Sequence, residues 1–173
     1  MKKTLKIAGI VLLALLLVVL AYVAYVFLSY HRIEDNLSLT PEGSASASVR
    51  TDIPYTVVSY NIGFGAYESD YMDGGTESWA WSKERLDANL ANIAQVLQKQ
   101  NADFYFVQEV DAGSTRSYHR DEAALLRQAL PNFSSVWGQN YDSPFLFWPL
   151  TQPHGSSVSG LMTFSTAPIS SSL

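Results

Sequence analysis

The chain has 173 residues, of which 47% are hydrophobic and 13% aromatic, and its formal net charge is −5. It contains no cysteine, which excludes disulfides, zinc-thiolate sites and a cysteine nucleophile. From Arg50 onward, seven Lys and Arg residues stand against thirteen Asp and Glu residues. This acidic balance offers no basic surface for a nucleic-acid backbone or an anionic membrane, so nucleic acid is a less favoured partner.

The first segment, residues 1–30, predicts a membrane anchor. Three lysines precede residues 7–30, which carry no Lys, Arg, Asp or Glu and, at about 1.5 Å per residue, can cross a hydrocarbon core of about 30 Å. The alternative is a cleaved signal peptide, which needs a shorter apolar region and a small-x-small cleavage site. Residues 21–24 (AYVA) have small residues at the wrong spacing. We expect a retained single-pass anchor in the plasma membrane, with a cytoplasmic N-terminus and an extracytoplasmic domain, because basic residues before a span stay inside.

After the anchor, residues 31–50 predict a flexible stalk. Residues 36–50 (NLSLTPEGSASASVR) are rich in Ser, Ala and Gly and have little apolar surface to bury. A folded domain is therefore expected over residues 51–173.

Within the domain, the pattern predicts a strand, a helix and a second strand. Residues 55–61 are short and rich in β-branched and aromatic side chains, which is typical of a strand. Residues 82–100 have helical spacing with Ser82 as the N-cap, and one face carries Leu86, Leu90, Ile93, Ala94 and Leu97. Residues 103–110 are nearly continuous in apolar residues, as expected of a strand covered on both faces. In such a unit the two strands run parallel and end at the same edge of the sheet.

Asn61 and Glu109 are the polar residues at those two strand ends. In open α/β sheets this edge is where ligands usually bind. A carboxamide oxygen and a carboxylate suit a small hard cation such as Mg²⁺, together with waters and a substrate phosphate. Gly63 and Gly65 would let the chain turn away from the site. The simpler alternatives are that Asn61 is a turn residue and that Glu109 is solvated. The alternative for Glu109 is the weaker one, because a carboxylate at the end of so apolar a strand is seldom fully buried without a partner.

The remaining features are interpreted as structure. Residues 120–130 predict a short amphipathic helix, residues 133–138 a strand, and residues 140–155 a long loop over the site. The aromatic residues that we expect to pack in the core are Phe145, Phe147 and Trp148 in this loop, and Trp79 and Trp81 before the first helix. His31 stands at the end of the membrane span, and we expect His119 and His154 in loops or on the surface.

Three segments resemble, in order, the first three blocks of the endonuclease/exonuclease/phosphatase superfamily: SYNIGFG at 59–65, DFYFVQEVD at 103–111 and SGLMTFSTAPI at 159–169. This resemblance implies an α/β fold of two β-sheets packed face to face between helices, and a phosphoester hydrolase that depends on Mg²⁺, with Mn²⁺ as the alternative ion. Glu109 matches the superfamily's metal-ligating glutamate, and Asn61 matches the asparagine that helps to order the metal and the phosphate. Arg116 resembles an arginine that reaches a phosphate oxygen, and its alternative role is a surface ion pair with Asp111 or Asp121.

Two later blocks of that superfamily do not occur in the chain: a Gly-Asp-x-Asn turn, and a Ser-Asp-His end that contributes the general base. We therefore expect residues 51–173 to be the N-terminal part of the two-sheet sandwich, without the C-terminal catalytic half and inactive alone. The expected function is a membrane-tethered phosphodiesterase or phosphatase that acts on a lipid headgroup or a small phosphoester and is held to the membrane by residues 7–30. The alternative is a non-catalytic, membrane-anchored binding domain that keeps the fold without activity.

Overall fold

The computed structural model describes residues 2–30, 32–68 and 78–170. The chain forms two compact units, Met1–Arg32 and Ile33–Leu173. His31 lies outside the described residues.

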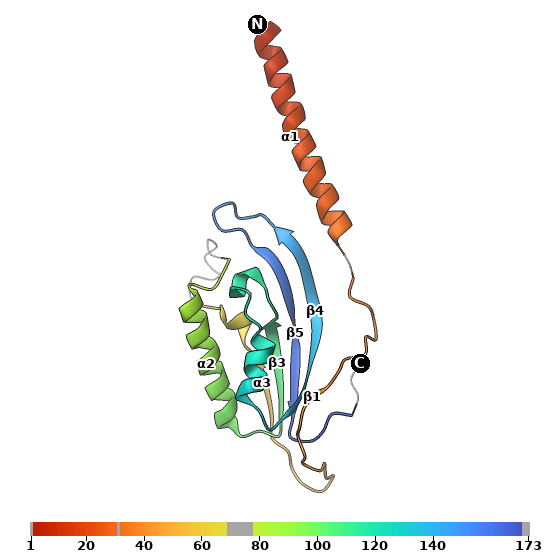
Figure 1. The fold of residues 1–173 in the computed structure, drawn as a ribbon, viewed down its shortest axis with the longest axis vertical. Coiled ribbons are helices and arrows are strands. Elements are labelled where there is room, and N and C mark those ends of the chain that lie inside the picture. The colour runs from red at the N-terminus through yellow and green to blue at the C-terminus, as the bar shows by residue number, and fades with distance from the viewer. Residues whose placement is uncertain (1, 31, 69–77, 171–173) are drawn as a thin grey trace. The chain divides into compact units, whose positions relative to one another are not determined.

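The first unit is the helix α1 (Lys2–Ser29), none of whose residues is buried (Figure 1). Over its most apolar 18 residues the mean hydropathy is 3.0, so by length and composition the helix can cross a membrane. A signal sequence near the N-terminus meets the same criterion. The apolar helix is therefore confirmed, and its retention and orientation stay predictions.

The second unit contains a five-stranded mixed sheet in the order β1-β4-β5-β3-β2. The strands are β1 (Glu42–Gly43), β2 (Val57–Asn61), β3 (Phe104–Asp111), β4 (Ser134–Leu146) and β5 (Gly155–Ser165). β2 and β3 pair in parallel, which confirms the predicted strand–helix–strand unit, and the other pairs are antiparallel. The α/β class is thus confirmed. The described residues form this one sheet, so the second sheet of the sandwich stays a prediction.

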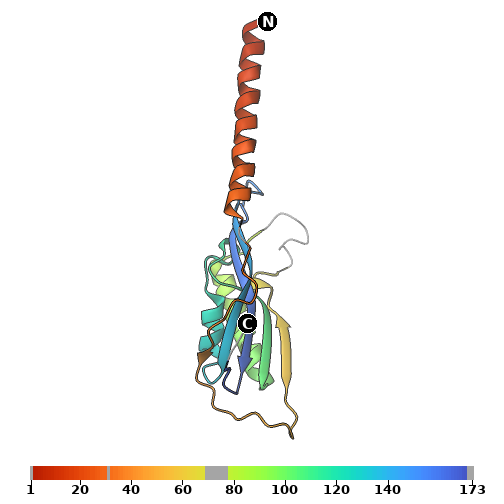
Figure 2. The same ribbon diagram turned by 90° about the vertical axis from the view of Figure 1, so that its right-hand side faces the viewer.

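Two helices, α2 (Lys83–Gln100) and α3 (Glu122–Ala129), lie on the same side of the sheet (Figures 1 and 2). α2 begins at the predicted cap, because Ser82 Oγ accepts the backbone N–H of Arg85 at 3.1 Å. The buried residues of α2 are four of the five predicted ones: Leu86, Leu90, Ile93 and Leu97. They form one core with buried side chains of α3, β3 and β5.

The other face of the sheet is exposed at β2, β3 and β5, whereas at β4 the side chain of Leu39 approaches Gly138, where an added Cβ would lie 3.0 Å from it. Val57 of β2, Phe106 of β3 and Leu161 of β5 remain 55%, 43% and 48% exposed. Because side chains alternate along a strand, these residues stand on the face that α2 and α3 do not cover.

The segment predicted as a stalk contributes an edge strand. Glu42 and Gly43 pair with β4, and the side chain of Glu42 forms an ion pair with Arg127 at 2.9 Å. Further along, the N–H of Ala47 donates to the carbonyl of Thr166 at 3.0 Å. Composition alone does not predict this strand, because an edge strand pairs through its backbone N–H and C=O groups and needs few apolar side chains.

Half of the predicted loop 140–155 is strand. β4 continues to Leu146, which pairs with Gly155, so the connection to β5 covers only residues 147–154. The expectation that the loop aromatics and Trp81 pack in the core is wrong: the exposed fractions are 50% for Phe145, 41% for Phe147, 68% for Trp148 and 70% for Trp81. Trp79 does pack, edge-on against Tyr118 at 5.6 Å between ring centroids.

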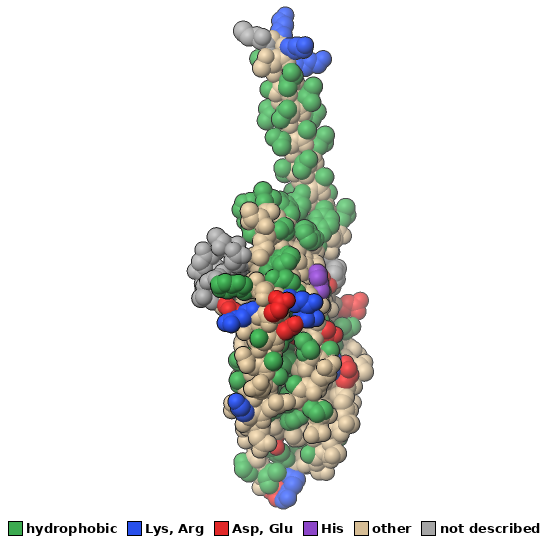
Figure 3. All heavy atoms as spheres, turned by 60° about the vertical axis from the view of Figure 1, so that its left-hand side comes forward, with side chains coloured by type: hydrophobic (Ala, Val, Ile, Leu, Met, Phe, Trp, Pro, Cys, Tyr) green, Lys and Arg blue, Asp and Glu red, His purple; other side chains and the backbone are tan. Residues whose placement is uncertain are grey.

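Charged side chains of both signs gather on the face shown in Figure 3. Ion pairs of α2 join Arg85 to Glu68 at 2.9 Å and Asp87 to Arg120. These basic groups are paired with carboxylates, which agrees with the acidic balance of the sequence.

Candidate functional site

Asn61 ends β2 and is exposed. Its Oδ1 accepts the backbone N–H of Gly63 at 2.9 Å, a local bond typical of turns that Asn begins. In the parallel register Asn61 lies opposite Gln108, the residue before Glu109. The end of β2 therefore lies beside Gln108, and β3 continues to Asp111. The turn role of Asn61 is present. Its contact with a metal or phosphate stays a prediction.

The chain after Asn61 turns through Gly63–Gly65, the 3₁₀ helix η1, in which all three residues have a positive φ. A Cβ added at Gly65 would lie 2.9 Å from Leu86 and Leu90 of α2. Glycine is needed there because both the left-handed backbone and the close approach of the helix disfavour a side chain. This turn holds the end of β2 against α2.

Glu109 lies in a β-bulge near the end of β3. Between Val107 and Val110 the register against β5 shifts, so Gln108 and Glu109 lie opposite Leu161 alone. Val107 and Val110 are 1% and 0% exposed in the core beneath the helices. Strict alternation would direct Glu109 into that core, and the extra residue of the bulge keeps it out. The φ of Glu109 is +57°, a left-handed conformation that costs a non-glycine residue about 1–2 kcal/mol.

The carboxylate of Glu109 adds a second unusual feature. Its Oε2 is buried and has no hydrogen-bond partner among the described residues. A buried polar atom without a partner is unfavourable, because it has lost water and gained nothing in return. Backbone strain of this kind clusters at functional sites. Of the predicted site residues, Glu109 is therefore the one whose surroundings best suit a ligand.

Arg116, in the 3₁₀ helix η2 (Thr115–Ser117), forms a buried ion pair with Asp111. Its Nε and Nη2 donate to the two carboxylate oxygens at 3.0 and 2.8 Å, and Ser117 Oγ donates to the same carboxylate at 2.8 Å. The guanidinium lies 3.3 Å from the centroid of the Phe64 ring. The alternative pairing with Asp111 is thus present, but it is buried, with side-chain exposed fractions of 8% and 0%. The phosphate contact of Arg116 stays a prediction.

Glu122 is a buried carboxyl that sequence reasoning missed. It is 0% exposed, and its Oε2 accepts the backbone N–H of Asp111 at 2.9 Å. Burial, followed by the negative charge of Asp111, raises the pKa of Glu122 well above its ordinary value. Helical spacing could have indicated its burial, since Glu122 stands four residues before the buried Leu126 on the same face of α3.

The described histidines lie in loops or on the surface, as predicted. His119 is exposed, and its Nδ1 lies 2.7 Å from the carbonyl of Gly113. His154 precedes β5 and is partly buried. Burial and the positive charge of Arg116 lower the pKa of His154, and Asp111 partly opposes this shift. The structure therefore brings His154 close to the Asp111–Arg116 pair.

The donors at the strand ends fit part of a magnesium site. Mg²⁺ is usually held by one or two carboxylates together with waters and substrate phosphates, and Glu109 and Asn61 supply one carboxylate and one carboxamide. No group of three or more Asp, Glu or His residues that could hold a metal occurs within residues 2–30, 32–68 and 78–170. The metal and its complete set of ligands stay predictions.

Comparisons with known proteins give no information on the family or function of the chain. No family model matches the chain, and neither the curated proteins nor the solved structures include a match to it.

Proposed function

We propose that this chain is part of a membrane-tethered, metal-dependent phosphoester hydrolase, either a phosphodiesterase or a phosphatase. The observation that carries the proposal is Glu109, a glutamate with a strained backbone at the carboxyl end of a parallel strand and with a buried carboxylate oxygen that has no partner among the described residues. The segment around it, DFYFVQEVD, resembles the block in which the endonuclease/exonuclease/phosphatase superfamily carries its metal-ligating glutamate.

In this proposal Glu109 holds Mg²⁺ or Mn²⁺, and Asn61 orients the phosphate from the adjacent strand end. The bound ion would neutralise the phosphoryl oxygens and stabilise the leaving oxygen. The Asp111–Arg116 pair fixes the loop after β3, and the stacking of Arg116 on Phe64 ties that loop to the turn after β2. The proposal assigns the general base that activates water to a part of the protein outside the described residues. A second sheet would pack on the open face of the first.

The test is Glu109→Gln in the full-length protein. The substitution keeps the size of the side chain and removes the charge that holds the cation, so turnover of a generic phosphodiester should fall by orders of magnitude and Mg²⁺ dependence should weaken. Asn61→Ala should have a smaller effect, because it removes one polar contact worth about 1–3 kcal/mol and no charge. Glu84→Gln, at an exposed position in the first turn of α2, is the matched control and should behave as wild type.

Mn²⁺ binding, measured by electron paramagnetic resonance, shows whether a variant has lost a metal ligand or only a catalytic step. Glu109→Gln should weaken Mn²⁺ binding, and Glu84→Gln should not. Ordinary Mg²⁺-dependent turnover by the Glu109→Gln protein would contradict the site. A wild-type protein that binds a phosphoester without hydrolysing it would favour the non-catalytic binding domain.

A further inference from the structure

The tip of the β4–β5 hairpin is exposed and apolar. The exposed fractions of Phe145, Phe147, Trp148 and Leu150 are 50%, 41%, 68% and 70%. Large apolar side chains that are exposed together mark a contact with a partner or a membrane.

The composition around the tip favours lipid as its partner. Residues 143–170 contain no Lys, Arg, Asp or Glu, so the tip can enter an apolar phase without burying an ion. Trp148 adds an amphipathic ring, whose body is apolar and whose N–H can stay at the level of the lipid headgroups. The tip offers no charge to a charged protein surface.

The helix α1 and the linker that follows it can hold this tip near a bilayer. α1 is long and apolar enough to cross a membrane. Residues 30–41, which link α1 to β1, reach at most about 43 Å when fully extended. A tether of this length gives the tip a high effective concentration at the membrane surface, so that a weak affinity for lipid is sufficient.

We propose that residues 145–150 insert their aromatic side chains into the interface of the bilayer in which α1 is anchored. The base of the tip is tied to the rest of the unit, since Trp79 Nε1 donates to the carbonyl of Pro153 at 2.7 Å and the N–H of Ser156 donates to Thr115 Oγ1 at 3.0 Å. Insertion would therefore set the height of the loop after β3, which follows Glu109, above the membrane. The inference rests on the expected anchor and does not require the hydrolase site.

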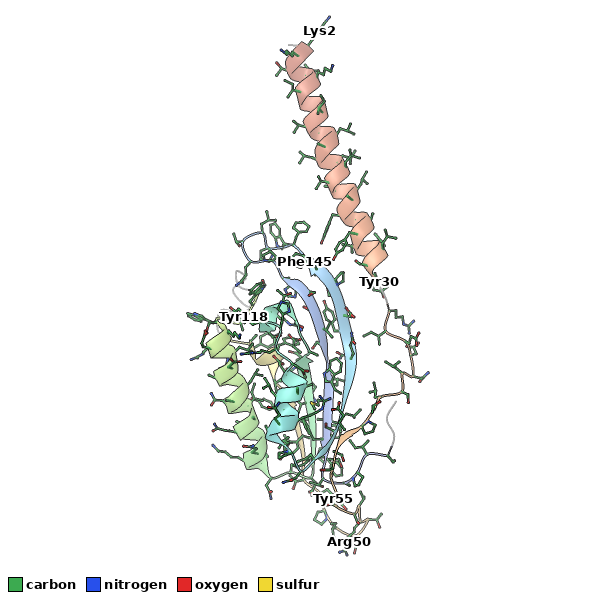
Figure 4. All side chains as sticks on the ribbon, viewed as in Figure 1. Lys2, Tyr30, Arg50, Tyr55, Tyr118 and Phe145 are labelled. Atoms are coloured by element: carbon green, nitrogen blue, oxygen red, sulfur yellow. The ribbon has the colours of Figure 1, made fainter. Side chains whose placement is uncertain are left out.

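The absence of cysteine allows a site-specific test. A Leu150→Cys variant carries one fluorophore at the tip, and a Thr51→Cys variant carries one beside Arg50, which lies with Tyr55 at the end of the unit opposite to Phe145 and Tyr118 (Figure 4). The full chain is reconstituted in phosphatidylcholine vesicles that contain a quencher at headgroup depth. We expect several-fold stronger quenching of the label at position 150 than of the label at position 51.

Two further variants in the Leu150→Cys background test the chemistry. Phe147→Ser combined with Trp148→Ser should remove most of the quenching. Val96→Ser, at an apolar position of α2 with an exposed fraction of 41%, should leave it unchanged. Quenching should also persist in about 1 M NaCl, because the tip has no charge for salt to screen.

Four results would overturn the proposal. These are equal quenching at positions 150 and 51, loss of quenching in high salt, and unchanged quenching in the double variant. The fourth is release of the chain from the vesicles by carbonate washing, which would show that the tip is not held near a bilayer. Emission at position 150 that responds to the protein-to-lipid ratio but not to the quencher would assign the tip to contacts between copies of the chain.

Discussion

The carboxyl groups of Glu109, Asp111 and Glu122, between the end of β3 and the start of α3, differ in what surrounds them. Glu109 has a strained backbone and a buried oxygen without a partner among the described residues. Asp111 is fully buried and makes a bidentate ion pair with Arg116. Glu122 is equally buried, one of its carboxyl oxygens also has no hydrogen-bond partner among the described residues, and burial raises its pKa well above the ordinary value. The carboxyl group thus serves in three ways: as a candidate ligand, as one partner of a buried ion pair, and as a core side chain whose protonated form is favoured by burial.

Glu122→Gln tests the neutral state of that carboxyl group. Because its pKa is raised in the native state, its contribution to stability is full below about pH 4.5, the ordinary value, and is lost as the pH rises through the raised native pKa. Glutamine resembles the neutral acid in shape and does not titrate. The free energy of unfolding of the variant, relative to wild type, should therefore rise with pH, by at most about 1.4 kcal/mol per pH unit. Pulse proteolysis of the full chain in urea, at about pH 5 and about pH 8, measures this difference.

The control for this prediction is Glu84→Gln. The pKa of Glu84 is lowered by a hydrogen bond to its own backbone and by one to Ser82, so glutamine at this exposed position should not gain stability relative to wild type as the pH rises. A Glu122→Gln protein whose difference from wild type is the same at both pH values would show that Glu122 does not titrate differently in the folded and unfolded states.

At the scale of elements, the β4–β5 hairpin meets the loop after β3 at Gly155. This residue begins β5 and has a φ of +72°, and a Cβ there would lie 2.3 Å from Thr115 Oγ1. The neighbouring N–H of Ser156 donates to the same oxygen at 3.0 Å. The two elements are therefore in direct contact, and this contact is possible because Gly155 has no side chain.

Gly155→Ala should be more destabilising than Gly113→Ala. Gly113 also has a positive φ, +91°, but a Cβ there would meet nothing within 4 Å, so both variants share the backbone penalty of about 1–2 kcal/mol. Only Gly155→Ala adds overpacking, which costs about 1–3 kcal/mol more. Urea midpoints of the full chain, measured by pulse proteolysis, compare the two variants. Equal losses would contradict the close contact with Thr115.

At the scale of the whole molecule, the proposed function requires the second unit to lie outside the membrane that α1 is expected to span. A reporter enzyme fused after Leu173 should be active on the extracytoplasmic side, because the lysines that precede the apolar residues favour a cytoplasmic N-terminus. The fusion should stay with membranes after carbonate washing. Release of a shortened soluble product would instead identify α1 as a cleaved signal.

The features that the sequence determined by itself are those with a local cause. The apolar run of α1, the Ser82 cap and the buried stripe of α2 follow from composition and helical spacing within one segment. The parallel pairing of β2 and β3 follows from the helix between the two strands, and it places Asn61 beside Gln108.

Other features were decided only by the tertiary structure, because they depend on residues distant in sequence. The bulge at Glu109 exists only where β3 pairs with β5, about fifty residues later. The edge strand β1 and the full length of β4 likewise depend on long-range backbone pairing, which side-chain composition does not encode. The pKa of Glu122 is raised because folding excludes water and brings Asp111 beside it. Local patterns therefore predicted the strands that carry the candidate site residues, and long-range packing decided the conformation and surroundings of the carboxylates.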